Sequence, residues 1–114
     1  MVTPRGYVPD RGDLIWINFN PQAGREQAGR RPALVLSPAK YNGRVGLALL
    51  CPITRQAKGY PFEVPVVSKG IEGVVLSDHV KSLDWNLRET EFAGKSPAPV
   101  VATVLNNIAK LIGE

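Results

Sequence analysis

The chain has 114 residues, a length typical of one domain, and we expect residues 1–114 to fold as a single unit. Its composition, 44% hydrophobic and 21% charged, is that of a globular rather than a disordered chain. The net charge of +4 is unevenly distributed. Residues 21–59 hold seven basic side chains and one acid, a net charge of +6, whereas the remainder carries −2. The sequence therefore directs attention to one basic third of the chain.

Composition also excludes several kinds of site. Cys51 is the only cysteine and His79 the only histidine. These counts exclude an intramolecular disulfide, a cysteine-rich zinc site, a three-histidine metal site and a two-histidine acid–base pair within one chain. No apolar run approaches the roughly 18 residues of a membrane helix, and the N-terminal residues do not resemble a signal peptide. We therefore expect a cytoplasmic protein with no membrane contact, no metal and no other cofactor.

The first half of the chain predicts three strands. Residues 13–20 alternate two apolar faces and are rich in β-forming side chains. Residues 21–31, rich in Gly, Gln and Arg, have no hydrophobic period and predict a long loop of the kind that carries function. Residues 32–37 predict a second strand. The pair Asn42-Gly43 predicts a turn, and the largely apolar residues 45–54 a third strand buried on both faces.

The second half predicts shorter strands. Residues 62–67 form a fourth strand interrupted by Pro65, which favours an edge position or a bulge. Residues 73–77 and 80–85 predict two more strands. Residues 87–93 are consistent with either a last strand or a turn of helix.

The C-terminal segment predicts one amphipathic helix. Ser96 is expected as its N-cap, with Pro97 at the first helical position and Gly113 at the C-terminal cap. Apolar residues recur between them at three- and four-residue spacing: Val101, Val104, Leu105, Ile108, Leu111 and Ile112. About six short strands with one terminal helix indicate a mainly β, α+β fold built on a small, strongly bent antiparallel sheet or barrel.

Arginine chemistry is the strongest functional signal in the residues themselves. Arg25, Arg30 and Arg31 lie in the predicted loop, and guanidinium groups bind phosphate through paired hydrogen bonds. Residues 54–56, Thr-Arg-Gln, end the third strand. If these two segments converge, they form a phosphate-sized site. The residues alone thus indicate a polyanion binder, with a merely solvated basic loop as the open alternative. We expect Trp16 and Trp85 in the core and Cys51 to be an inert buried thiol.

Six short motifs follow one another between residues 12 and 82, within a likeness that extends from about residue 7 to residue 112: Gly12-Asp13-Leu-Ile-Trp16, Glu26-Gln27-Ala-Gly29-Arg-Arg31-Pro32, Val35-Leu-Ser37-Pro38, Cys51-Pro-Ile-Thr54, Lys58-Gly59-Tyr-Pro61-Phe62 and Asp78-His79-Val80-Lys81-Ser82. In this order they resemble the MazF/PemK family of toxin–antitoxin ribonucleases. The resemblance implies an SH3-like barrel of about six to seven strands with a C-terminal helix, assembled as a homodimer.

The resemblance also implies an activity and its partners. Members of this family are metal-independent endoribonucleases that cleave single-stranded RNA at a short sequence. Cleavage without a metal generally uses the 2′-hydroxyl of the RNA as nucleophile and leaves a 2′,3′-cyclic phosphate and a 5′-hydroxyl. An antitoxin with an acidic, flexible tail neutralises the toxin, and the basic segment of this chain suits such a tail.

The family's catalytic residues carry over by position. Arg31 and Thr54 match its catalytic arginine and threonine, and Glu26 and Gln27 match the acid and amide of its active loop. We expect Arg31 to stabilise charge on the phosphate, since its pKa above about 12 makes it a poor acid. Thr54 would donate a hydrogen bond to a phosphate oxygen. Glu26 would accept the 2′-hydroxyl proton, or else pair with neighbouring arginines.

The RNA-binding residues are expected to be polar and mostly basic: Arg25, Gln27, Arg30, Arg55, Gln56, Lys58 and His79. His79 stands where many family members have glutamine, so hydrogen bonding or base stacking is favoured over acid–base catalysis. Two alternatives remain open. The first is a CcdB-like toxin, which poisons gyrase with the same fold and without catalysis, and the second is a relic that only binds RNA.

Overall fold

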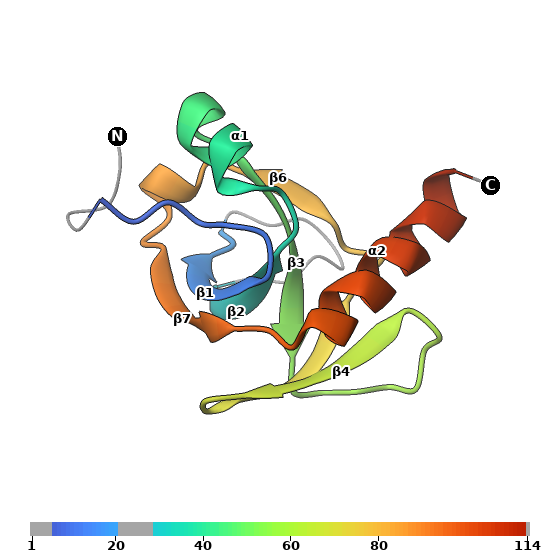
Figure 1. The fold of residues 1–114 in the computed structure, drawn as a ribbon. Coiled ribbons are helices and arrows are strands. Elements are labelled where there is room, and N and C mark those ends of the chain that lie inside the picture. Colours follow the sequence, from blue (N-terminus) through green and yellow to red (C-terminus); the bar gives the residue numbers. More distant parts are fainter. Residues whose placement is uncertain (1–5, 21–28, 114) are drawn as a thin grey trace.

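The computed structural model describes residues 6–20 and 29–113. Figure 1 shows a strongly curled sheet with a long helix lying across it. The elements follow one another as β1 (Asp13–Asn18), β2 (Arg30–Val35), α1 (Ala39–Val45), β3 (Ala48–Thr54), β4 (Glu63–Ser68), β5 (Ile71–Leu76), β6 (Lys81–Leu83), a 3₁₀ turn η1 (Trp85–Leu87), β7 (Glu91–Lys95) and α2 (Ala98–Ile112).

All strand pairings are antiparallel, and the sheet order is β4-β5-β3-β2-β1-β7, with β6 also paired to β3. β3 is the central strand: residues 48–50 pair with β6, and residues 53–54 pair with β5. The hydroxyl of Ser68, at the end of β4, donates to the carbonyl of Lys95 in β7, which links the two ends of this order. The predicted mainly β, barrel-like fold with a C-terminal helix is confirmed.

The curled sheet separates two apolar cores. Leu14 belongs to the core under α2, with Trp16 packed against it, whereas Ile15 and Ile17 belong to the core that contains Trp85. Successive strand residues point to opposite faces, so the alternation seen in the sequence maps directly onto these two cores. Trp85 is buried, as expected. Cys51 is also buried, and this burial, aided by Asp78, raises the pKa of its thiol to about 12.

The turn predicted at Asn42-Gly43 is wrong, because residues 39–45 form the helix α1. Asn42 is fully buried, and its side-chain amide donates to the carbonyls of Pro9 at 2.7 Å and Ser37 at 2.9 Å. These bonds bury the asparagine in a helix rather than exposing it at a turn. The left-handed residue is Gly46, with φ of 83°, which ends α1. The third strand begins three residues later than predicted, and its Leu49 is exposed.

The C-terminal helix has the predicted extent but a different N-cap. Pro97 is the capping residue, and the Ser96 hydroxyl donates to the carbonyl of Pro97 instead of accepting from the helix. Val104 is completely buried against the sheet. Upstream, the ambiguous residues 87–93 end the 3₁₀ turn and begin β7. β4 lies at the edge of the sheet, as its Pro65 predicted.

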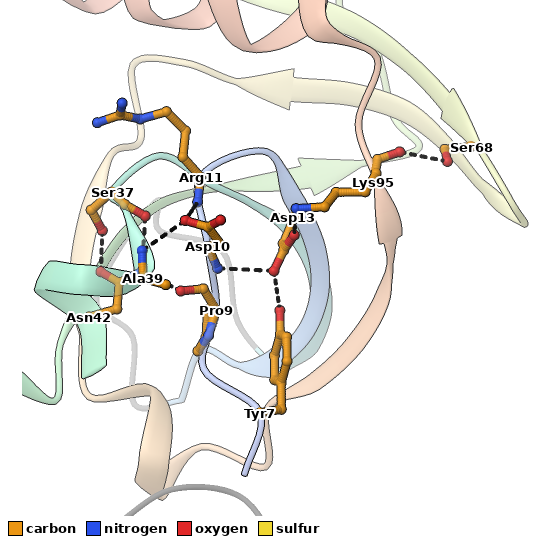
Figure 2. Close-up of polar contacts among 10 residues, drawn as sticks. All are labelled: Tyr7, Pro9, Asp10, Arg11, Asp13, Ser37, Ala39, Asn42, Ser68 and Lys95. Atoms are coloured by element: carbon orange, nitrogen blue, oxygen red, sulfur yellow. Dashed lines mark hydrogen bonds and ion pairs between the residues drawn. The ribbon is translucent and has the colours of Figure 1, made fainter. Parts of the chain in front are cut away.

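A buried carboxylate ties the N-terminal segment to the sheet (Figure 2). Asp13 accepts a 2.6 Å bond from the Tyr7 hydroxyl and a 2.9 Å bond from the Asp10 amide, and it pairs with the Lys95 ammonium at 2.5 Å. Burial, and then the bond to Asp13, raise the pKa of Tyr7. The same carboxylate raises the pKa of Lys95. The cluster joins residues before β1 to the end of β7. No helix among the described residues is long and apolar enough to cross a membrane.

Candidate functional site

The strand register brings Arg31 and Thr54 together. β2 and β3 pair with Ala33 opposite Pro52 and Val35 opposite Leu50. Continuing this register by two residues places Arg31, at the start of β2, level with Thr54, at the end of β3. Alternation puts both side chains on the face of Ala33, Val35 and Leu50, which line the Trp85 core. The end of β3 that carries Thr54 and the start of β2 that carries Arg31 belong to neighbouring antiparallel strands.

The backbone around Thr54 is held closely. Its hydroxyl oxygen accepts a 3.2 Å bond from the amide of Gln56. Gly73 in β5 crosses so near that a Cβ there would lie 2.3 Å from the carbonyl oxygen of Thr54. Only a glycine permits this approach, because real Cβ atoms do not come so close to a carbonyl oxygen. The position of Thr54 is therefore fixed by the neighbouring strand.

The loop after β3 carries three of the predicted RNA-binding residues. Arg55, Gln56 and Lys58 are all exposed. The backbone amides of Lys58 and Gly59 donate to the carboxylate of Glu63, with distances of 3.0 to 3.1 Å. The loop is therefore anchored at both ends: by Thr54 and Gly73 at its start and by Glu63 at its end. Its side chains project from an ordered backbone that follows directly on Thr54.

Arg30 lies apart from Arg31, although the two residues are adjacent in sequence. Its guanidinium donates to the carbonyl of Glu89 and pairs with the carboxylate of Glu91, both at 2.6 Å. Adjacent residues of a strand point to opposite faces, so only one of these arginines shares the face of Thr54. The alternation of β2 places Arg31 on the face that Thr54 shares, and the structure directs Arg30 to Glu89 and Glu91.

His79 lies in the turn after β5, half-buried, and its amide donates to the carbonyl of Leu76 at 3.0 Å. Leu76 pairs with Glu63 across β4 and β5. This turn therefore lies beside the end of the basic loop rather than at its beginning. Of the predicted site residues, His79 is thus placed nearer to the Glu63 end of the loop than to Arg31.

Arg25, Glu26 and Gln27 lie outside the described residues. The residues that flank them come together: the amide of Phe19 donates to the carbonyl of Gly29 at 2.8 Å, and the amide of Gly29 donates to the side chain of Asn20 at 3.0 Å. These contacts extend the pairing of β1 and β2 beyond Arg30. Within residues 6–20 and 29–113, no group of three His, Cys, Asp or Glu side chains is arranged to hold a metal ion.

Glu63 and Gly73 support the site but were not singled out from the sequence. A single acid directly after a basic segment gives a weak signal, because charge alone does not distinguish an anchor from a solvated side chain. A glycine inside an apolar strand is a better signal, since it often marks a close backbone approach. Which residue the glycine approaches depends on the pairing of β3 with β5, and no local sequence pattern specifies that pairing.

Known proteins resemble this chain over almost its whole length. Residues 10–112 match the model of the PemK-like, MazF-like toxins of type II toxin–antitoxin systems. The endoribonuclease toxin MazF of Escherichia coli K12 is 48% identical over 107 residues, which cover 94% of this chain and 96% of that protein. The endoribonuclease toxin ChpB of the same organism is 34% identical, covering 90% and 93%.

Solved structures agree with this relationship. A crystal structure of MazF from Deinococcus radiodurans superposes with a TM-score of 0.91 at 57% identity, covering 95% of this chain and 99% of that one. MazF in a MazE–MazF structure from the same organism gives a TM-score of 0.82 at 52% identity, covering 94% and 97%. With the family model matched over residues 10–112, the chain belongs to the PemK-like, MazF-like toxins of type II toxin–antitoxin systems.

Proposed function

We propose that this protein is the endoribonuclease toxin of a toxin–antitoxin pair and cleaves single-stranded RNA at a short sequence without a metal. The observation that carries the proposal is the register of β2 against β3, which, continued by two residues, sets Arg31 opposite Thr54 on one face. It occurs in a chain 48% identical to an endoribonuclease toxin, MazF of Escherichia coli. A guanidinium and a hydroxyl beside an ordered basic loop suit a phosphodiester as ligand.

In the proposed mechanism the RNA supplies its own nucleophile. The 2′-oxygen bonds to phosphorus, the bond from phosphorus to the 5′-oxygen breaks, a proton leaves the 2′-hydroxyl, and solvent water supplies a proton to the 5′-oxygen. Arg31 balances the negative charge that develops on the phosphate, and Thr54 donates its hydroxyl hydrogen to a non-bridging oxygen. Glu26 accepts the proton of the 2′-hydroxyl. The products are a 2′,3′-cyclic phosphate and a 5′-hydroxyl.

RNA contacts in this proposal come from both sides of Arg31 and Thr54. Arg55, Gln56 and Lys58 of the exposed loop, with His79 beside it, bind the backbone and bases on one side. Arg25, Gln27 and Arg30 contribute on the other side. For Arg30 this requires its exposed ion pair with Glu91 to open, and such pairs contribute only about 0–1 kcal/mol.

The same proposal names the protein's partners. MazF of Deinococcus radiodurans forms a complex with MazE, and we propose that this chain likewise binds a cognate antitoxin. Its acidic, flexible tail would compete with RNA for the basic surface. We further propose that the toxin works as a homodimer in the cytoplasm, where its RNA substrate is found.

The decisive experiment incubates the protein with a long single-stranded RNA in EDTA and maps the new 5′ ends. We expect cleavage at one short shared motif. Arg31→Ala and Thr54→Ala should each abolish it while the fold, followed by circular dichroism, persists. Arg44→Ala is the matched control, because it removes an equal charge from exposed Arg44 in α1 of the same basic stretch. Unchanged cleavage in both site variants, or strict dependence on added Mg²⁺, would refute the proposal.

A further inference from the structure

The basic loop between β3 and β4 contains a carboxylate that faces its own backbone. Both oxygens of Glu63 accept the amide of Lys58, at 3.1 and 3.0 Å, and Oε1 also accepts the amide of Gly59 at 3.0 Å. The amide of Glu63 in turn donates to the carbonyl of Tyr60 at 3.1 Å. The side chain and the backbone of one residue thus hold three consecutive loop positions.

Glu63 is itself attached to a rigid part of the molecule. It pairs with Leu76 at the start of the β4–β5 ladder. The carbonyl of the preceding residue, Phe62, accepts bonds from the amide of Ser77 at 3.1 Å and from its hydroxyl at 2.5 Å. The buried side-chain amide of Asn107, in α2, donates to that hydroxyl oxygen at 3.1 Å. A continuous chain of hydrogen bonds therefore runs from α2 through Ser77, just after β5, to Phe62 at the base of the loop.

An acid at this place is unexpected for a surface that binds a polyanion, since a carboxylate repels phosphate. The geometry resolves the conflict. Carboxylates are strong acceptors for backbone amides, and two amides of the loop satisfy this one. The Glu63 carboxylate bonds to main-chain amides, whereas the side chains of Arg55 and Lys58 are exposed. The acid orders the loop without forming an ion pair with its cations.

We propose that Glu63 is a positioning residue for RNA binding: its carboxylate fixes the backbone of residues 58–60 so that the basic loop is ordered before RNA arrives. This inference rests on the proposed ribonuclease function and adds a residue that touches no RNA. Fixing a loop in its bound geometry raises affinity, because binding then loses less conformational freedom. Glu63 therefore strengthens RNA binding even though its own charge opposes it.

The two possible effects of Glu63, repulsion of RNA by its charge and positioning of the loop, predict opposite changes in RNA affinity when the residue is replaced. If Glu63 acted only through its charge, neutralising it would tighten RNA binding, and Gln and Ala would act equally. If it positions the loop, Glu63→Ala weakens binding by about tenfold, and Glu63→Gln weakens it less because its carbonyl still accepts an amide. The control Glu72→Gln removes the same charge from an exposed position on β5. It should leave binding unchanged or slightly tighter.

Two measurements read out these variants. The first is the Kd, at one fixed salt concentration, for a single-stranded RNA that the wild type cleaves, with hydrogen in place of the 2′-hydroxyl at the cleavage site. The second is amide hydrogen exchange, followed by NMR, at Lys58 and Gly59. We expect it to be faster in Glu63→Ala, intermediate in Glu63→Gln and unchanged in Glu72→Gln. A merely structural role would lower the thermal midpoint without changing exchange at these two amides selectively.

Each outcome is decisive. The proposal is supported if RNA binding weakens and amide exchange becomes selectively faster at Lys58 and Gly59, with both effects larger in Glu63→Ala than in Glu63→Gln. Wild-type binding in Glu63→Gln and Glu63→Ala alike, or tighter binding in both, overturns it while leaving the ribonuclease assignment intact. A wild-type protein that binds no single-stranded RNA overturns the proposed function, and this inference with it.

Discussion

At the scale of single residues, Gly73 is as important to the candidate site as the side chains that would touch RNA. Gly73→Ala places a Cβ 2.3 Å from the carbonyl oxygen of Thr54, so β3 and β5 must move apart at this point. A displacement of about 1 Å can reduce a rate by about 100-fold. We expect RNA cleavage to fall by at least that factor, with a lower thermal midpoint.

A second glycine provides the comparison for this prediction. Gly43, in α1, would bring a new Cβ to the two methyl groups of Val8, at 3.3 and 3.7 Å, and that side chain can shift. Gly43→Ala should therefore retain cleavage. Assays at a temperature well below both thermal midpoints separate a displaced Thr54 from loss of the fold. Full activity in folded Gly73→Ala would show that the position of Thr54 tolerates the change.

Sequence patterns predicted residues well where the pattern is local. The alternation in β1 assigned Leu14 and Ile15 to opposite faces, and both are buried in separate cores. The residues alone left it open whether the arginine segment and residues 54–56 converge, because a register between β2 and β3 is a non-local property. Glu63 was not predicted for the same reason: its role depends on the backbone amides that its carboxylate binds, and its charge alone does not indicate them.

At the scale of elements, α2 illustrates what periodicity can and cannot predict. The spacing of its apolar residues correctly predicted a helix, yet it grouped buried and exposed positions on one stripe. Val104 is completely buried, whereas its neighbour Leu105 is 39% exposed and Ile112 is 81% exposed. A helical pattern defines a face, but the width of the sheet beneath it decides how much of that face is covered.

This difference predicts the stability of two neighbouring variants. Val104→Ala removes two methyl groups from the core under α2 and should lower the free energy of unfolding by about 2 kcal/mol. Leu105→Ala removes a larger but more exposed group and should cost about 1 kcal/mol or less. Urea denaturation of both variants and of the wild type measures the two effects. A larger loss for Leu105→Ala would mean that the exposed stripe is covered in solution.

The helix α1 was not predicted, because the Asn42-Gly43 pair within it is a strong local signal for a turn. Asn-Gly is typical of tight turns, and nothing nearby in the sequence opposes that interpretation. The helix forms because the Asn42 amide meets the carbonyls of Pro9 and Ser37, and because its backbone carbonyl accepts the indole N–H of Trp85 at 3.1 Å. One of these partners lies 33 residues upstream and another 43 downstream, beyond the reach of a turn propensity.

At the scale of the whole molecule, the buried Cys51 thiol and two groups that contact Asp13, half-buried Tyr7 and exposed Lys95, respond to alkaline pH in the same direction. Burial raises the pKa of Cys51 to about 12, and the pKa values of Tyr7 and Lys95 are raised around Asp13. A raised pKa means that the folded state holds its proton more tightly than the unfolded state. The stability from each group is therefore complete below its unfolded pKa and is lost as the pH rises.

The free energy of unfolding should accordingly be nearly constant from about pH 7 to 8 and fall above about pH 8.5, where an unfolded cysteine ionises. Cys51 alone should account for a loss of about 2–3 kcal/mol by pH 10.5, and Tyr7 and Lys95 add to the fall above about pH 10. Urea unfolding at pH 7.5, 9.5 and 10.5 measures this curve. Cys51→Ala should remove the decline between pH 8.5 and 10 while keeping the steeper one above it. An identical decline in that variant would mean that the thiol keeps an ordinary pKa and that its burial is not maintained in solution.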